Sequence, residues 1–164
     1  MADVSFKQKE KFMIDCSFKL NGKPMSNFKM GAPSFPAYSG LDKYINKKIS
    51  ACIEGFGPIP PGKYYIFDRQ SGGILGPLRD FITGRDEWFA LYAIDSKIDD
   101  ETYCEKVKRG LFRLHPKGPQ GVSQGCIVIN DWSHFQTIKA LLEKTKTELI
   151  SETGLEAYGT VTVK

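Results

Sequence analysis

Apolar and polar residues alternate along several short stretches of the chain, which is the pattern of β-strands that bury one face. The clearest case is residues 12–20, where the apolar side chains occupy every second position. Asn21-Gly22 follows, and this pair favours a tight hairpin turn, so residues 23–30 are expected to form the return strand. Further strands are predicted over residues 63–67, 88–94, 109–115, 126–130 and 158–163.

The segment after residue 130 has the spacing of an amphipathic helix. Apolar residues recur at 135, 138, 141 and 142 behind a good N-cap, Asn130 or Asp131, so a helix is expected to run to about residue 149. His134 lies in its first turn and is expected to face solvent. Residues 41–54 are predicted to hold a short helix, residues 31–40 and 68–87 to be loops, and residues 95–108 to be a solvated loop or short helix.

About six to eight short strands with one long helix predict a mainly β fold, α+β at the margin, in a single domain spanning residues 1–164. The net charge is +4 and the lysines are scattered, so a nucleic-acid-binding surface is not expected. No apolar run approaches the roughly twenty residues of a membrane span, and residues 1–11 lack the apolar core of a secretory signal. We therefore expect that the protein is made in the cytoplasm and does not insert into a membrane.

The candidate chemistry lies in the stretch 109–130. His115 closes one predicted strand, a Gly/Pro-rich loop follows, and Cys126 opens the next strand. A loop of about ten residues can fold back and bring the two strand ends together. An imidazole beside a thiol is the minimum apparatus for nucleophilic acyl transfer, and an adjacent imidazolium lowers the pKa of a thiol. The alternative is that His115 caps a strand and Cys126 is an inert core residue.

The residues just before Cys126 fit the same chemistry. Gly125 lets a substrate carbonyl approach the backbone, and the amides of Gly125 and Cys126 are candidate donors to an oxyanion. Ser123 is placed to hydrogen-bond within the loop or to orient His115. His134 is the competing histidine, but a histidine at a strand end before the loop gives the better geometry.

The other cysteines, Cys16, Cys52 and Cys104, allow three pairings for one disulfide, and the default expectation is three buried thiols. A zinc site is not expected, because the chain has no Cys-x-x-Cys pair and only two histidines. The acidic residues between 95 and 101 lack the regular spacing of a calcium-binding loop.

These motifs together resemble a known enzyme family. A histidine, a Gly-rich loop and Ser-x-Gly-Cys-Ile are similar to the active-site signature of L,D-transpeptidases with the YkuD-type catalytic domain. Residues 35–40 (FPAYSG) and 57–66 (GPIPPGKYYI) resemble the small branch of that group that type VI secretion systems deliver as antibacterial effectors. The three matches run in family order from residue 35 to residue 129.

The resemblance implies an L,D-transpeptidase β-sandwich with one helix after the nucleophile strand. It implies Cys126 as nucleophile, His115 as general base, Ser123 as an assisting residue, and no metal or organic cofactor. The implied reaction is L,D-carboxypeptidase or L,D-transpeptidase chemistry on peptidoglycan stem peptides through a Cys thioester. The implied partners are a cognate immunity protein and a secretion-system delivery component, and the implied place of action is the periplasm of the target cell.

One departure bears on substrate binding. Wall-building members of the family carry an arginine two residues after the cysteine, and this chain has Val128 there. Lys117 and Arg113 are candidate cations for the substrate carboxylate, although each is also explained as a solvated surface charge. Tyr38, Ser39 and Gly40 are candidate substrate-binding residues, with a loop anchor as the alternative for Tyr38. Two further alternatives stay open, a non-catalytic peptidoglycan-binding module and a housekeeping enzyme of wall remodelling.

Overall fold

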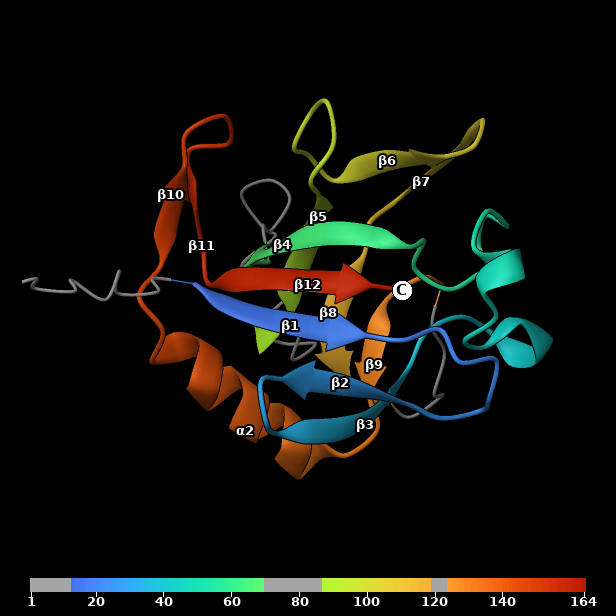
Figure 1. Cartoon of the computed structure of the whole chain (residues 1–164), viewed down its shortest axis with the longest axis horizontal. Coiled ribbons are helices and arrows are strands. Elements are labelled where there is room, and N and C mark those ends of the chain that lie inside the picture. Colours follow the sequence, from blue (N-terminus) through green and yellow to red (C-terminus); the bar gives the residue numbers. More distant parts are fainter. Residues whose placement is uncertain (1–12, 70–86, 119–123) are drawn as a thin grey trace, which may run out of the picture.

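The computed structural model describes residues 13–69, 87–118 and 124–164. Eight strands close into a barrel, in which each strand is hydrogen-bonded to the next (Figure 1). In their order around the barrel they are β1 (Ile14–Phe18), β12 (Gly159–Val163), β4 (Gly62–Asp68), β5 (Phe89–Ala93), β8 (Arg113–Pro116), β9 (Ile127–Ile129), β3 (Ser34–Tyr38) and β2 (Ser26–Met30). The prediction of a mainly β fold is confirmed, but the strands form a closed barrel rather than the two-sheet sandwich that the resemblance implies.

Two pairs of neighbouring strands are parallel, β1 with β12 and β8 with β9, and the other pairs are antiparallel. Alternating side chains of all eight strands fill the interior, and many of them are aromatic. β1 and β2 form the predicted hairpin, although the connection is longer than the two-residue turn expected after residue 20. Within it, the Asn21 side chain accepts from the amide of Lys23 and donates to the carbonyl of Met25.

The helix α2 (Trp132–Glu143) begins directly after the short strand β9 and joins the barrel core. Its N-cap is Asp131, whose carboxylate accepts hydrogen bonds from the amides of Ser133 and His134. The prediction of a capped helix here is confirmed, but the helix ends six residues early. The chain from about residue 144 onward forms instead the hairpin of β10 (Glu148–Ile150) and β11 (Leu155–Ala157).

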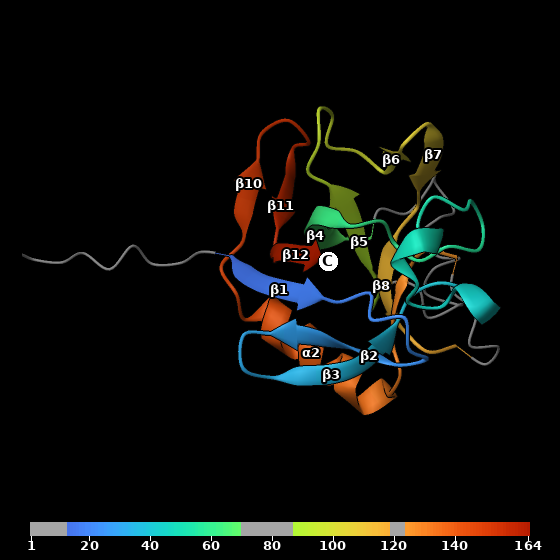
Figure 2. The same cartoon turned by 45° about the vertical axis from the view of Figure 1, so that its right-hand side comes forward.

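Figure 2 shows that the β10–β11 hairpin and a second hairpin, β6 (Glu101–Cys104) with β7 (Val107–Gly110), stand on the side of the barrel opposite α2. The expectation of a loop or short helix over residues 95–108 is wrong. The sequence pattern does not predict these strands, because both faces of the hairpin are largely solvated and its sequence therefore lacks an apolar alternation.

The expectation of a loop over residues 31–40 is also wrong, because β3 runs through Pro36 and pairs with both β2 and β9. Burial of Phe35 and Ala37 outweighs the turn-forming composition of this stretch. Residues 41–54 form two 3₁₀ turns, η1 (Asp42–Tyr44) and η2 (Lys48–Ser50), rather than an amphipathic helix, and Ile49 is 94% exposed. Most of the predicted loop 68–87 lies outside the described residues.

In the part of the chain that the structure describes, no helix has the length and apolar character needed to cross a bilayer.

The contact of α2 with the barrel gives a test of this packing. Phe135 is fully buried against Phe89, so Phe135→Ala is expected to lower the free energy of unfolding by about 3–5 kcal/mol. The matched control is Thr137→Ala on the exposed face of the same helix, which is expected to change it by about 0.5 kcal/mol or less. Urea unfolding measures both, and equal losses would contradict the packing described.

Candidate active site

The parallel pairing of β8 and β9 sets how the two candidate catalytic residues lie relative to each other. Leu114 lies beside Ile127 and His115 beside Val128. Leu114 and Ile127 point into the barrel core, so the alternation of side chains turns His115 and Cys126 to the outer face. Diagonal neighbours on adjacent strands lie about 7–8 Å apart, within reach of a ring side chain. The two residues are therefore neighbours across a parallel pair and not across a strand that folds straight back, and their direct contact stays a prediction.

The ring of His115 is buried and held at two places. Its Nδ1 lies 2.8 Å from the carbonyl oxygen of Pro116. Since a carbonyl can only accept, Nδ1 carries the proton in this contact and Nε2 is left as the basic nitrogen. The indole of Trp88 stacks on the imidazole, with 4.1 Å between ring centroids and 15° between planes.

Cys126 is partly exposed and lines a cavity of about 520 Å³. Other residues of the cavity come from the segment at Glu54 and Gly55, and from residues 100–101 and 108–111 around the β6–β7 hairpin. The thiol lies 3.9 Å from the carbonyl oxygen of Leu111. The nucleophile candidate thus stands at the wall of a cavity large enough to take part of a peptide.

Burial raises the pKa of the Cys126 thiol to about 11, against the lowering effects of the Arg113 backbone N–H, the Arg113 guanidinium and Arg69. This is the opposite of the direction expected from the sequence. Only about one thiol in ten thousand is ionised at pH 7 with such a pKa. A base that removes the proton as the sulfur reacts therefore favours chemistry at this sulfur near neutral pH.

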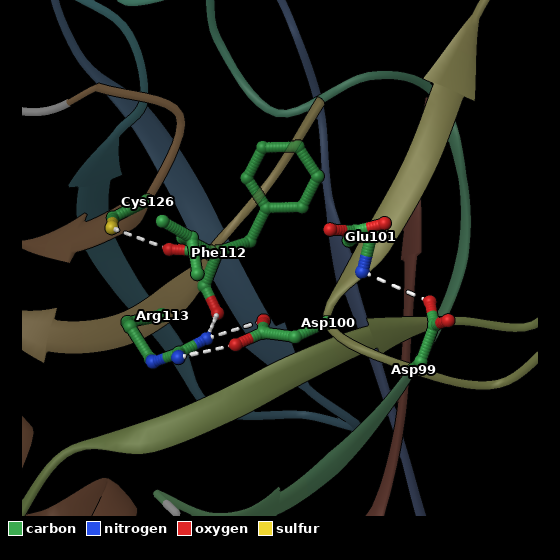
Figure 3. A network of polar contacts seen from close by, with 7 residues as sticks. Asp99, Asp100, Glu101, Phe112, Arg113 and Cys126 are labelled. Carbon is green, nitrogen blue, oxygen red and sulfur yellow. Dashed lines mark hydrogen bonds and ion pairs between the residues drawn. The ribbon is translucent and has the colours of Figure 1, made fainter. Parts of the chain in front are cut away.

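Arg113 is held in an ion pair and is not a solvated charge (Figure 3). Its two terminal nitrogens lie 2.7 and 2.6 Å from the two carboxylate oxygens of Asp100, and Nη1 also donates to the carbonyl of Phe112. Only 11% of the Arg113 side chain is exposed. Because both terminal nitrogens are engaged by Asp100, Arg113 fits poorly as a substrate clamp, and it lowers the pKa of the Cys126 thiol through its backbone N–H and its charge.

Position 125, just before Cys126, requires a glycine because of its backbone conformation and its close neighbours. Its φ is +107°, and a Cβ there would lie 2.7 Å from Nη2 of Arg109 and 2.7 Å from a ring carbon of Phe112. Arg109 is buried, and its guanidinium donates to the carbonyls of Ala51, Gly57 and Pro58. Arg109 therefore holds the segment of residues 51–58 in place, and its guanidinium lies close to Gly125. The roles of the Gly125 and Cys126 amides in an oxyanion hole stay predictions.

The predicted substrate residues 38–40 lie at the end of β3. Tyr38 stands beside Val128 on the outer face and is 6% exposed, and burial raises the pKa of its phenol. Ser39 is fully buried; its hydroxyl accepts from the amide of Ile59 and its own amide donates to Asn46. Gly40 has φ +98° and packs against Pro58. These contacts favour a positioning role for Ser39 and Gly40, whereas direct substrate contact stays a prediction for all three.

The remaining candidate residues differ in how they are placed. Lys117 is exposed, two residues beyond His115. Ser123 lies outside the described residues, so its predicted role stays a prediction. His134 does not simply face solvent, because its ring is half-buried against Phe35, with 5.6 Å between centroids. No cluster among the described residues has the ligands for a metal ion.

Two of the other cysteines form a disulfide, so the default expectation of three thiols is wrong. Cys52 is bonded to Cys104, while Cys16 is free and buried in the barrel. The bridge links the segment after η2 to the β6–β7 hairpin, the same two parts of the chain that line the cavity. The two cysteines are 52 residues apart in the sequence, and the sequence alone does not show which cysteines pair.

The sequence reasoning missed Trp88, Arg69 and Arg109, which reach the site from other elements. Arg69 lies over Trp88, with its guanidinium carbon 5.6 Å from the ring centroid. Trp88 and Arg109 are each the first residue of a predicted strand, and that position was the one signal available. Which partners they meet depends on the barrel register, which a single sequence does not reveal.

Comparison with known families decides the assignment. The Tlde1 domain matches residues 33–153, which covers most of the chain and includes His115 and Cys126. The chain belongs to the Tlde1 domain family. This is a family of type VI secretion L,D-transpeptidase effectors, so the chain is a type VI secretion effector associated with antibacterial action on peptidoglycan. Neither the curated proteins nor the solved structures contain a match to this Tlde1 chain.

A matched pair of glycine substitutions tests the space before Cys126. Gly125→Ala is expected to lower the free energy of unfolding by about 1–3 kcal/mol, because alanine is strained at this φ and meets Arg109 and Phe112. Gly118→Ala, with nothing within 4 Å of the added Cβ, is the control and is expected to change stability little. Urea unfolding compares the two, and a harmless Gly125→Ala would contradict the described backbone.

The raised pKa of Cys126 predicts a pH dependence. A His115→Asn variant has no imidazole to take the proton, so the rate at which iodoacetamide alkylates Cys126 follows the thiolate fraction. The rate is expected to rise about tenfold per pH unit between pH 7 and pH 9.5, still below the pKa of about 11. Mass spectrometry of the Cys126 peptide measures it. A rate that levels off below pH 9 would contradict the raised pKa.

Proposed function

We propose that this effector is a cysteine acyltransferase with L,D-carboxypeptidase or L,D-transpeptidase activity on the tetrapeptide stems of peptidoglycan. The observation that supports the proposal is the β8–β9 register, which makes His115 a diagonal neighbour of Cys126 across the parallel pair, together with the cavity that Cys126 lines. The motif order of the sequence and the membership in the Tlde1 family support the same assignment.

In the first step the Cys126 sulfur attacks the carbonyl at the L-centre of diaminopimelate. Nε2 of His115 takes the thiol proton as the carbon–sulfur bond forms, since the raised thiol pKa disfavours a free thiolate at rest. The amides of Gly125 and Cys126 donate to the oxyanion of the tetrahedral intermediate. The carbon–nitrogen bond to the terminal D-alanine then breaks, and the same imidazole gives the proton to the leaving amine.

In the second step the thioester is resolved by water or by an amine. Water gives an L,D-carboxypeptidase, while a free D-amino acid or the amine of a neighbouring stem gives exchange or cross-linking. His115 removes a proton from the incoming nucleophile in each case, and the Cys126 sulfur leaves and regains its proton. Every proton is carried by groups of the chain, and the proposed chemistry needs no metal or organic cofactor.

The recognition residues proposed around this centre are Tyr38, Ser39, Gly40 and Lys117, with Ser123 assisting. Val128 replaces the arginine of wall-building relatives and leaves Lys117 as the exposed cation nearest in sequence to His115. We propose that the protein acts in the target-cell periplasm after delivery by the secretion system. A cognate immunity protein then protects relatives of the producer.

Incubation with purified tetrapeptide muropeptides tests the chemistry. The wild type is expected to release D-alanine, giving tripeptide or exchanged products in mass spectra. Cys126→Ala is expected to abolish release, and His115→Asn to lower it by about 10²–10⁴-fold. Cys16→Ala is the matched control, since Cys16 faces the barrel interior, and a folded Cys16→Ala should keep the activity.

Three outcomes would contradict parts of the proposed function. Stems left intact by a folded protein that binds peptidoglycan would favour a non-catalytic binding module. Unchanged D-alanine release by Cys126→Ala would remove the cysteine from the mechanism. If the protein cleaves stems but is harmless when exported to the periplasm, the enzyme serves wall remodelling rather than attack.

A further inference from the structure

A row of three side chains crosses the outer face of the barrel beside the catalytic pair. The register pairs Asp68 with Phe89 and Phe89 with Leu114, so the next residues along, Arg69, Trp88 and His115, stand side by side on neighbouring strands. The amide of Arg69 donates to the carbonyl of Trp88 at 3.3 Å, which continues the β4–β5 ladder to this row. Trp88 therefore lies between a guanidinium and the proposed general base.

We infer that Trp88, with Arg69 against it, is a positioning residue that holds the His115 imidazole in the orientation needed to take the Cys126 proton. The inference rests on the proposed function, because it assigns His115 the role of base.

The orientation of a histidine ring needs such support. The torsion that rotates the imidazole about its Cβ–Cγ bond has broad minima, so packing has to select one orientation. The contact of Nδ1 with Pro116 fixes one edge of the ring, but this partner is the adjacent residue in the chain and leaves the tilt of the plane open. The stacked indole, 4.1 Å away and nearly parallel, fixes the plane.

The placement of Trp88 fits this role better than a role in the core. Its neighbour Phe89 is buried inside the barrel, whereas Trp88 is half-buried on the outer face. Its described ring contacts are the imidazole on one strand and the guanidinium on the other. Arg69 holds the indole by a cation–π contact, and its charge also lowers the pKa of the Cys126 thiol.

The rate at which iodoacetamide alkylates Cys126 at pH 7.5 measures how well the His115 ring is oriented to take the thiol proton. This experiment needs no peptidoglycan. The sulfur displaces iodide, a carbon–sulfur bond forms, and the thiol proton passes to His115. Without reductant the reaction is selective for Cys126, because Cys52 and Cys104 are bonded to each other and Cys16 is buried. Mass spectrometry of the Cys126 peptide gives the rate for each variant.

Trp88→Leu is expected to slow alkylation by about 3- to 10-fold, the range of a lost aromatic pair, while Trp88→Phe keeps a flat ring and stays within about threefold of wild type. Arg69→Met is expected to slow it by about 2- to 5-fold. The matched controls are Trp132→Leu, an exposed tryptophan of α2, and Lys29→Met, an exposed cation of β2, which should leave the rate unchanged.

The decisive comparison is made in a His115→Asn background. There Trp88→Leu should have no further effect, because the indole acts through the ring that has been removed. An equal slowing in both backgrounds, or a Trp88→Leu rate equal to wild type, would overturn the inference. If Trp88→Leu does not fold, the same comparison between Trp88→Phe and Trp88→Met decides it.

Failure of the proposed function gives a different result. If His115→Asn alone leaves the alkylation rate unchanged, His115 is not the base, and both the proposed mechanism and the inference fail. If His115→Asn slows alkylation and the Trp88 variants do not, only the positioning role is lost.

Discussion

The structure of the site depends on the parallel pairing of β8 with β9. Parallel neighbours are normally joined by a crossover of a dozen or more residues, and here the connection between Pro116 and Ile127 is about ten residues long. The register is set by burial, since Leu114, Ile127 and Ile129 are all completely enclosed in the barrel. A slip of one residue would turn Ile127 to the outside and Cys126 into the core. The hydrophobic interior therefore determines where the thiol and the imidazole stand.

The same arrangement determines the protonation state of the Cys126 thiol. Burial holds the proton on Cys126, and Arg113 offsets this only in part because its charge is shared with Asp100. A thiol that is neutral at rest is a poor nucleophile toward adventitious electrophiles. In the proposed mechanism it reacts when a substrate carbonyl and the His115 imidazole are in place together. Arg109 and the Cys52–Cys104 bridge hold the surrounding cavity walls through backbone carbonyls and a covalent link.

The sequence predicted those features that local chemistry decides. Alternation over residues 12–20 predicted β1, and Asp131 was one of the two predicted N-caps of α2. His115 and Cys126 were identified as the candidate pair because they end and begin two predicted strands; in the structure they lie one residue before the end of β8 and one residue before the start of β9. The sequence did not predict β3 because it contains Pro36. A strand can include a proline where burial of neighbouring side chains compensates for the lost hydrogen bond. The solvated β6–β7 hairpin shows no apolar period to detect.

The remaining features come from contacts between distant parts of the chain. The Trp88–His115 stack, the reach of Arg109 to three carbonyls and the pairing of Cys52 with Cys104 all depend on the barrel register. The direction of the Cys126 pKa also depends on burial, which the motif alone does not report. Local patterns thus identified the candidate residues, and the three-dimensional packing determines their contacts and the pKa of the thiol.

Trapping of the acyl-enzyme tests the central claim most directly. The protein is mixed with tetrapeptide muropeptide, quenched in acid after a short interval and mapped by peptide mass spectrometry. We predict a stem peptide that lacks its terminal D-alanine and is attached to Cys126. An acyl group carried by any other residue, or D-alanine release by protein whose Cys126 has been alkylated beforehand, would contradict it.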